Sequence, residues 1–162
     1  MQDIHNHPTV EKHKITTKQY LILFAIIAIV FILDQLSKFI ITQMMQLNES
    51  LFFTSFFSLT YITNTGSSFG SLQGYNQLLI WITIIVIGFI LYYLPYFEQQ
   101  IFPALGLVIG GALGNLIDRI RIGAVIDFID FKVWPVFNIA DSAITIAAIM
   151  IVVLTFFWKP AK

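Results

Sequence analysis

The sequence contains no cysteine, and its three histidines all lie near the N-terminus. The absence of cysteine excludes thiol nucleophiles, disulfides and cysteine-ligated metal sites. His5, His7 and His13 belong to a polar tail, where we expect them to be solvated. A Ser-His-Asp triad or a histidine-ligated zinc inside a membrane is therefore not expected, and we expect no metal and no cofactor. Ionisable chemistry is left to Asp, Glu, Lys and Arg.

Charged residues are also scarce. They make up 11% of the chain, against about a quarter in an ordinary soluble domain. Hydrophobic residues make up 57%, and the mean hydropathy is +0.82. A soluble protein of this size could not bury so much apolar surface, so the composition indicates an integral membrane protein. The formal net charge is zero, which gives no basic field that would attract nucleic acid.

Apolar runs predict four membrane-spanning helices, at about residues 20–45, 78–94, 101–117 and 141–158. The first run could also be the core of a signal peptide. However, no small-x-small cleavage site follows it, and Asp34 and Lys38 do. The sequence therefore predicts a single four-helix membrane domain over residues 20–158, with polar tails at 1–19 and 159–162.

Four spans place both termini on the same side of the membrane. The tails hold five basic residues, and the opposite side holds three, Arg119, Arg121 and Lys132. Because cytoplasmic segments carry more lysine and arginine, this distribution favours cytoplasmic termini.

Between the first two spans lies a segment rich in β-branched and aromatic residues, 51–63. Its alternating pattern predicts a strand, and turn residues follow it at 64–70. An open sheet cannot cross a bilayer, so we expect a small sheet on the outer surface.

In the third span, Gly106, Gly110 and Gly114 repeat every fourth position. This spacing predicts one helix face that packs closely against a neighbour.

Several polar residues at membrane depth need an explanation, because such residues are costly there. Asp34 and Lys38 are one helical turn apart, which favours a structural ion pair over a direct catalytic role. Asn115 and Arg119 share one face at the end of the third span. They either form a polar helix end or hold an active site, with Arg119 able to bind a carboxylate or a backbone carbonyl.

Three further acids lie near the last span. Taken alone, Asp141 fits a helix N-cap, and Asp127 and Asp130 fit surface-loop acids, Asp130 more so. A pair of aspartates can nevertheless hydrolyse an amide without cysteine, histidine or metal, because close carboxylates share one proton. The spacing does not distinguish Asp127 from Asp130 as the partner of Asp141.

The combination of motifs resembles the lipoprotein signal peptidases (signal peptidase II). The matching segments are Asp34-Gln-Leu-Ser-Lys38, Asn64-Thr-Gly-Ser-Ser-Phe-Gly70, Gly110-Gly-Ala-Leu-Gly-Asn-Leu-Ile-Asp-Arg119, Gly123-Ala-Val-Ile-Asp-Phe-Ile-Asp130 and Phe137-Asn-Ile-Ala-Asp-Ser142. The resemblance implies an aspartic endopeptidase whose catalytic pair is Asp127 and Asp141. It also implies that the residues surrounding this pair are Asp34, Lys38, Asn64, Gly66, Asn115, Arg119, Asn138 and Ala140.

The resemblance further implies a substrate and a location. The substrate is a prolipoprotein whose lipobox cysteine carries diacylglycerol, and cleavage occurs just before that cysteine. The site faces the extracytoplasmic leaflet of the bacterial inner membrane, under a cradle formed by the outer sheet. We expect a monomer in contact with membrane lipid and no nucleic acid partner. One departure is Gly66-Ser67-Ser68-Phe69, where the family usually has Gly-Ala-Ala-Phe.

Three other interpretations are compatible with parts of the sequence. Buried acids such as Asp34 and Asp141 could relay protons in a small proton-coupled transporter. A Ser–Lys peptidase could use Ser67, Ser68 or Ser142 with Lys38 or Lys132. A noncatalytic membrane scaffold would need no acid pair at all.

Overall fold

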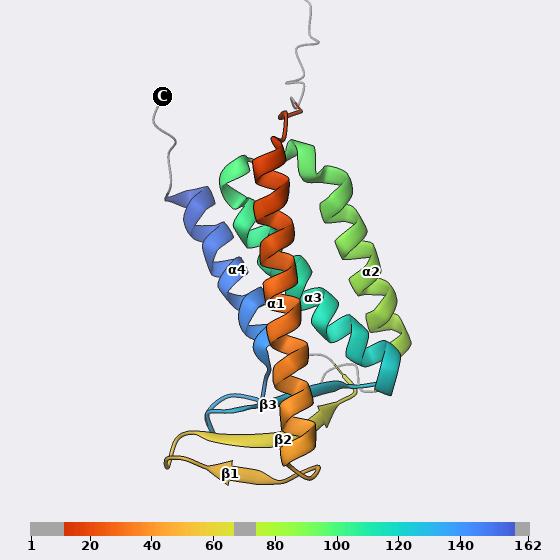
Figure 1. The fold of residues 1–162 in the computed structure, drawn as a ribbon, viewed down its shortest axis with the longest axis vertical. Coiled ribbons are helices and arrows are strands. Elements are labelled where there is room, and N and C mark those ends of the chain that lie inside the picture. Colours follow the sequence, from red (N-terminus) through yellow and green to blue (C-terminus); the bar gives the residue numbers. More distant parts are fainter. Residues whose placement is uncertain (1–11, 67–73, 158–162) are drawn as a thin grey trace, which may run out of the picture.

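A computed structural model of the chain describes residues 12–66 and 74–157. Four helices pack side by side, and a small sheet lies across one end of them (Figure 1). The helices are α1 (Thr17–Met44), α2 (Asn76–Tyr93), α3 (Phe102–Ile122) and α4 (Ile139–Phe156). The strands are β1 (Ser50–Phe52), β2 (Ser58–Asn64) and β3 (Val125–Asp130). Two short 3₁₀ helices, η2 (Leu94–Tyr96) and η3 (Gln99–Ile101), join α2 to α3. The predicted fold class, four membrane helices with a small sheet, is confirmed.

All four helices are long and apolar enough to cross a membrane. In its most apolar stretch α3 has 56% of its residues buried, against 17% in each of the other three helices. Therefore α3 forms the centre of the bundle, and the others expose apolar side chains to lipid.

Helix α3 also runs five residues past the predicted end of the third span, to Ile122. Its last turn tolerates Arg119 and Arg121 because cations are favourable at a helix C-terminus.

Small residues let α1 approach α3 closely, as the spacing predicts. A Cβ added to Gly110 would lie 2.9 Å from Cβ of Val30, and Gly106 and Gly114 face α1 in the same way. On the neighbouring face of α3, Gly111 lies against the backbone of α4, a contact that the four-residue spacing did not include. Each helix–helix contact therefore depends on the absence of a side chain at these positions.

Replacing Gly111 with alanine is expected to destabilise the bundle. The new Cβ would lie 2.5 Å from the carbonyl oxygen of Ala140 and 2.9 Å from Cγ1 of Ile144, and a helix backbone cannot move away locally. We expect a loss of about 2 kcal/mol, measured as a lower thermal unfolding midpoint in detergent. The control is Gly88→Ala in α2, because a Cβ there meets nothing within 4 Å. Equal midpoints for the two variants would contradict this packing account.

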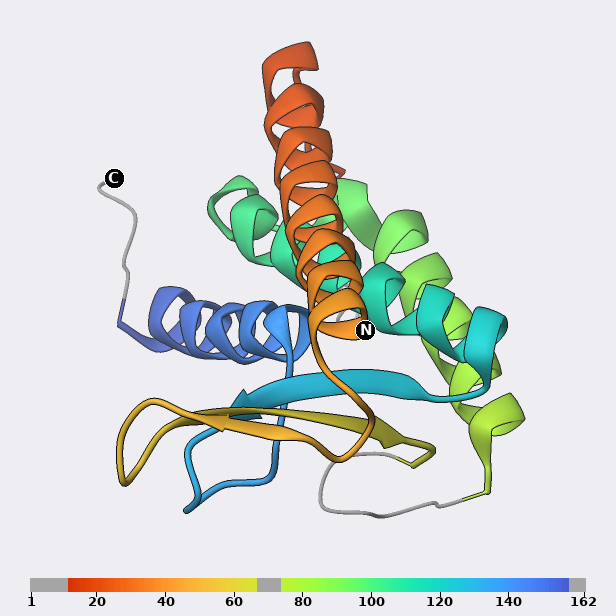
Figure 2. The same cartoon turned by 60° about the horizontal axis from the view of Figure 1, so that its bottom comes forward.

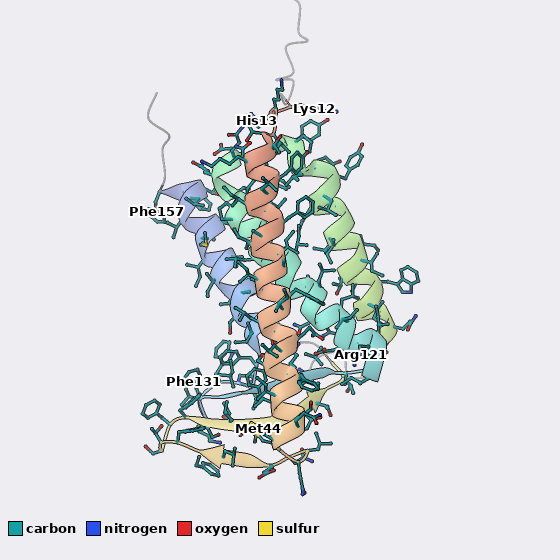
Figure 3. All side chains as sticks on the ribbon, viewed as in Figure 1. Lys12, His13, Met44, Arg121, Phe131 and Phe157 are labelled. Carbon is teal, nitrogen blue, oxygen red and sulfur yellow. The ribbon has the colours of Figure 1, made fainter. Side chains whose placement is uncertain are left out.

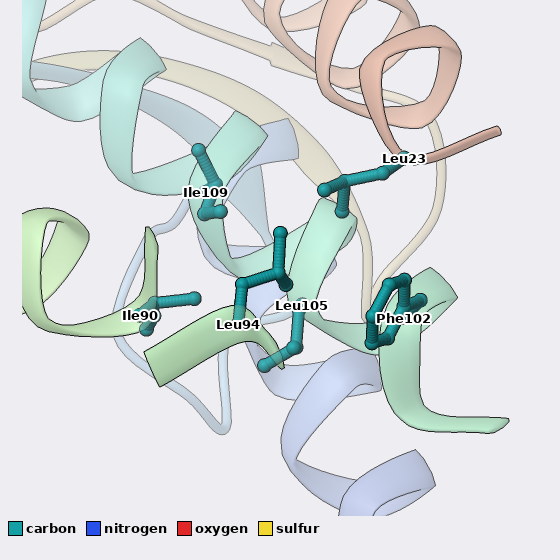
Figure 4. Close-up of a cluster of buried hydrophobic side chains, with 6 residues drawn as sticks. All are labelled: Leu23, Ile90, Leu94, Phe102, Leu105 and Ile109. Carbon is teal, nitrogen blue, oxygen red and sulfur yellow. The ribbon is translucent and has the colours of Figure 1, made fainter. Parts of the chain in front are cut away.

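A hydrophobic cluster joins α1, α2 and α3 at one end of the bundle (Figure 4). Its buried side chains are Leu23, Ile90, Leu94, Phe102, Leu105 and Ile109. This end also carries Lys12, His13 and Phe157, whereas Met44, Arg121 and Phe131 lie at the other end (Figure 3). The described ends of the chain therefore lie together, on the side away from the sheet.

The sheet is antiparallel, in the order β1-β2-β3, with β3 nearest to the helices (Figure 2). The C-terminal end of α1 packs on the sheet through Ile41 and Met45, which contact Phe128.

The predicted strand at 51–63 forms two strands, β1 and β2, and the turn residue Asn64 still belongs to β2. The third strand comes from residues 125–130, which the sequence analysis treated as a surface loop. That treatment was wrong. The strand was missed because its partner, β2, lies roughly 60 to 70 residues earlier in the chain.

Candidate active site

The start of α4 presents Asp141 to the interior. Asn138 is the N-cap, and its Oδ1 accepts a hydrogen bond from the backbone N–H of Asp141 at 2.9 Å. The interpretation of Asp141 as the cap was therefore wrong, since it is the third residue of the helix. With capping done by Asn138, the carboxylate of Asp141 is free to face the cavity, at a helix end that favours negative charge.

Asp127 reaches the same place from the sheet. It lies on β3 opposite Ile62 of β2, and its side chain is only 2% exposed, so it is not a surface-loop acid. Two amide groups bind its two oxygens. Asn138 Nδ2 donates to Oδ1 at 2.7 Å, and Asn64 Nδ2 donates to Oδ2 at 3.2 Å. Asp127 is thus held in one orientation from both α4 and β2.

A bridge of two asparagines connects the two acids. Asn115 Nδ2 donates to Asp141 Oδ1 at 2.8 Å, and Asn138 Nδ2 donates to Asn115 Oδ1 at 3.1 Å. Asn138 also holds Asp127, so both carboxyl groups are attached to the same pair of amides. Both acids line one cavity of about 770 Å³, which also takes in Asn115 and Arg119. Both acids are therefore accessible from the same cavity.

The electrostatics of Asp127 suit proton transfer. Burial raises the pKa of Asp127 to about 7, and the charge of Asp141 adds to this effect. The amides of Asn64 and Asn138 and the charge of Lys38 oppose it. A carboxyl group with a pKa near neutrality can both give and take a proton, whereas a free aspartate with a pKa of about 3.9 stays ionised.

Arg119 forms the wall of the cavity next to Asn64 and Gly66. Its Nη2 donates to the carbonyl oxygen of Gly66 at 3.1 Å, so of the two predicted targets it binds the backbone carbonyl. The N–H of Gly66 in turn donates to Asn64 Oδ1 at 3.0 Å. This ties the end of β2 to α3. Ser67 and Ser68, where the chain departs from the usual pattern, lie outside the described residues.

Comparison with known proteins now identifies the family. The family model described as signal peptidase (SPase) II matches residues 26–157. The chain belongs to the signal peptidase II family. It is therefore a hydrolase, an aspartic-type peptidase by family, and a multi-pass protein of a bacterial membrane. This family assignment favours a peptidase over the transporter and scaffold alternatives.

Similar proteins cover most of the chain. The lipoprotein signal peptidase of Halothermothrix orenii is 43% identical over 142 residues, covering 86% of this chain and 97% of the relative. The lipoprotein signal peptidase of Moorella thermoacetica is 46% identical over 127 residues, covering 76% and 85%. A solved structure of a bacterial membrane enzyme superposes with a TM-score of 0.75 at 32% identity, covering 93% of this chain and 97% of that one.

A buried ionic cluster lies behind the cavity of this signal peptidase II family member. Lys38 Nζ is 2.7 Å from Asp34 Oδ2, as the spacing predicts, and it is also 2.7 Å from Asp118 Oδ2. Asp34 Oδ1 accepts the backbone N–H of Ala140 at 2.9 Å, which links α1 to the first turn of α4. Gln35 completes the cluster by donating to Asp118 Oδ1 at 3.0 Å. The cluster therefore joins three helices beneath the two acids.

The residues expected around the pair in the peptidase thus fall into two groups. Asn64, Gly66, Asn115 and Arg119 line the cavity together with Asp127 and Asp141. The other four are fully or almost fully buried, and they are Asp34, Lys38, Asn138 and Ala140. Asp118 and Gln35 were not predicted to have a role from the sequence. Their signal was present, since each is polar and adjacent in sequence to a residue that was assigned.

Asp130 belongs to a different cluster, on the sheet of the peptidase. It is buried, and it accepts hydrogen bonds from Ser58 at 3.3 Å, Thr60 at 2.8 Å and Lys132 Nζ at 2.6 Å. Burial alone would raise the pKa of Asp130, but the bonds from Lys132 and Thr60 outweigh burial and lower it to about 2. The interpretation of Asp130 as a surface-loop acid was therefore wrong. Its contacts are those of a permanently ionised structural group.

The Ser–Lys alternative finds no support in the described part of the chain. Ser142 Oγ donates to the carbonyl oxygen of Asn138 at 2.9 Å. Lys38 binds two aspartates, and Lys132 binds Asp130. Neither lysine is arranged as the base of a serine nucleophile, which needs a deprotonated amine within hydrogen-bonding reach of the hydroxyl. Ser67 and Ser68 are outside the described residues.

Proposed function

We propose that the protein removes signal peptides from diacylglyceryl-modified prolipoproteins, with Asp127 and Asp141 as the catalytic residues. The observation that carries this proposal is that both carboxyl groups line one cavity and are held by one pair of asparagine amides. The named relatives are lipoprotein signal peptidases, which supplies the substrate class. The proposed cleavage point is the peptide bond just before the lipid-modified cysteine.

The proposed chemistry needs no covalent intermediate. The two acids hold one proton between them, because close carboxylates cannot both ionise easily. The ionised member takes a proton from water as the water attacks the scissile carbonyl, and the protonated member donates to the carbonyl oxygen. The roles then reverse, and the leaving amine is protonated. The pKa of about 7 at Asp127 supports this exchange near neutral pH.

The lining of the cavity fits a substrate that is part peptide and part lipid. The lining includes the amide of Asn64 and the guanidinium of Arg119, which can bind peptide groups. It also includes apolar residues from the segment after β3 and from α4, among them Phe131, Val136 and Ile146. A lipid-modified cysteine and the end of an apolar signal peptide can pack against these apolar residues.

We further propose that the peptidase lies in the inner membrane with both termini in the cytoplasm. The described ends of the chain lie opposite the sheet and the cavity (Figure 3), so the cavity then opens at the extracytoplasmic face. The protein is proposed to act as a monomer surrounded by lipid. Enzyme and substrate share the bilayer, which raises the effective concentration of each near the other.

The proposal is tested by cleavage of a purified substrate. The wild-type protein in lipid nanodiscs is incubated with a prolipoprotein that carries diacylglyceryl-cysteine, and with the same precursor without the lipid. We expect mass spectrometry to find a mature chain beginning at the modified cysteine, formed only from the lipid-bearing precursor. A product cut at another bond, or equal cleavage of both precursors, would overturn the proposed specificity.

A further inference from the structure

We propose that Lys38 is a positioning residue for the Asp127–Asp141 pair and that it acts through the carboxamide of Asn115. This inference rests on the proposed function, because it assigns a role relative to that pair. It gives the ionic cluster behind the cavity a part in the reaction besides its part in packing the helices.

All three hydrogens of the Lys38 ammonium group are used. Its Nζ lies 2.7 Å from Asp34 Oδ2, 2.7 Å from Asp118 Oδ2 and 3.0 Å from Asn115 Oδ1. An ammonium group donates and cannot accept. Asn115 must therefore turn its carbonyl oxygen toward Lys38, since the reverse orientation would bring an NH₂ group against the ammonium. Its Nδ2 is then directed away from Lys38, and it donates to Asp141 Oδ1 at 2.8 Å.

The orientation of the Asn115 amide also fixes the orientation of the Asn138 amide. Asn115 Oδ1 also accepts from Asn138 Nδ2 at 3.1 Å, which sets the amide of Asn138 with its nitrogen toward Asn115. The same nitrogen donates to Asp127 Oδ1 at 2.7 Å, and Asn138 Oδ1 accepts the N–H of Asp141. One buried cation thus determines which atom of each amide faces each acid. Both acids receive donors rather than acceptors.

The charge of Lys38 also acts directly on the pair. Its side chain is 2% exposed, and charges interact more strongly away from water. The positive charge lowers the pKa of Asp127 and so opposes the effect of burial. The charged groups that act on Asp127 come from three helices: Lys38 of α1, Arg119 of α3 and Asp141 of α4. From β2 and from the cap of α4 it meets only the neutral amides of Asn64 and Asn138.

A structural ion cluster alone would not need the bond to Asn115. Lys38 already has a carboxylate partner on each of two helices, and these bonds suffice to join α1 to α3. Its third bond is directed at Asn115, whose Nδ2 donates to Asp141. Through this bond, the cluster holds the Asn115 amide in the orientation in which it donates to Asp141.

The test uses variants that separate positioning from folding. The first combines Lys38→Met with Asp118→Asn, which removes one positive and one negative charge and so keeps the net charge of the cluster. The second is Asn115→Leu, which keeps Lys38 with both acids. The control is Ser37→Ala, because Ser37 is the neighbour of Lys38 on α1 but donates to the backbone carbonyl oxygen of Asp34 and not to a side chain of the cluster. Each folded protein, isolated as a single gel-filtration species, is assayed for kcat, KM and pH dependence.

The expected results differ between the variants. For Lys38→Met with Asp118→Asn, the alkaline limb of the pH profile moves up by roughly half to one pH unit, because the charge that lowers the pKa of Asp127 is gone. For Asn115→Leu, kcat falls about 100-fold with KM changed less than about threefold. Ser37→Ala keeps the wild-type pH profile and a kcat within about threefold, because no side chain of the cluster loses a partner.

The inference is overturned if the first two variants show the wild-type kcat and pH profile. It is also overturned if the control shows the same changes, or if Asn115→Leu does not fold, since these results would leave a structural role only. Failure of the proposed function has a different signature. In that case Asp127→Asn would still cleave the lipid-modified substrate. An inactive Asp127→Asn with unchanged Lys38 variants removes only the inference.

Discussion

Replacing either Asp127 or Asp141 with asparagine is expected to lower kcat/KM for the lipid-modified precursor by at least about 10³-fold, with the protein still folded. Asparagine has nearly the same shape, but it cannot exchange a proton with water or with the scissile carbonyl. The amides that hold Asp127 and Asp141 can still bind the remaining carbonyl oxygen of each new side chain. The loss should therefore appear in the cleavage assay and not in the yield of folded protein.

Asp130→Asn is the matched control for this experiment. Asp130 is also a buried aspartate on β3, but its partners are Ser58, Thr60 and Lys132 of the sheet. Folded Asp130→Asn protein should keep its cleavage rate within a few-fold. Full cleavage by Asp127→Asn or Asp141→Asn would reject the assignment of the pair. An Asp130 variant as inactive as the other two would show that the assay reports damage to the sheet.

Removing Asp34 is expected to have the largest effect on stability. In Asp34→Ala, Lys38 loses a partner at 2.7 Å, and the backbone N–H of Ala140 loses its acceptor at 2.9 Å in a fully buried position. Asp118 still balances the charge of Lys38, so the loss is smaller than for an unpaired cation. We expect a loss of roughly 2–4 kcal/mol, measured as a lower folded yield and a lower unfolding midpoint in detergent.

Asp34→Asn separates the two contributions of Asp34. Its carbonyl oxygen can still accept the N–H of Ala140, while the charge opposite Lys38 is lost. The unfolding midpoint should therefore lie between those of the wild type and of Asp34→Ala. A normal yield and midpoint in Asp34→Ala, together with absent cleavage, would contradict the structural role and indicate direct participation in the reaction.

The helices could be predicted from the sequence because lipid requires long apolar segments. The close packing of α3 on α1 was also predictable, since glycines at every fourth position share one face. The C-terminal extension of α3 was missed because Asp118 and Arg119 mark a polar end. In the structure these side chains turn toward Lys38 and Gly66, so the helix can continue to Ile122.

The site itself was less predictable from local pattern. Asp127 and Asp130 are three residues apart on one strand, so their side chains point to opposite faces of the sheet. Only the pairing of β3 with β2 decides which face meets the helices, and that pairing is distant in sequence. The motif resemblance implied that Asp127 is the partner of Asp141, whereas the spacing did not distinguish Asp127 from Asp130. Asn138, and not Asp141, caps α4, because this helix begins two residues earlier than the predicted span.

The central claim, that Asp127 and Asp141 share one proton in the reaction, is tested most directly by the pH dependence of kcat/KM for the wild-type enzyme. A pair that must keep one proton gives a bell-shaped profile, because activity is lost both when the second proton binds and when the last one leaves. We expect the alkaline limb near pH 7, where Asp127 titrates. A profile that rises through about pH 4 and stays flat above it, as for a lone ordinary carboxylate, would contradict the account.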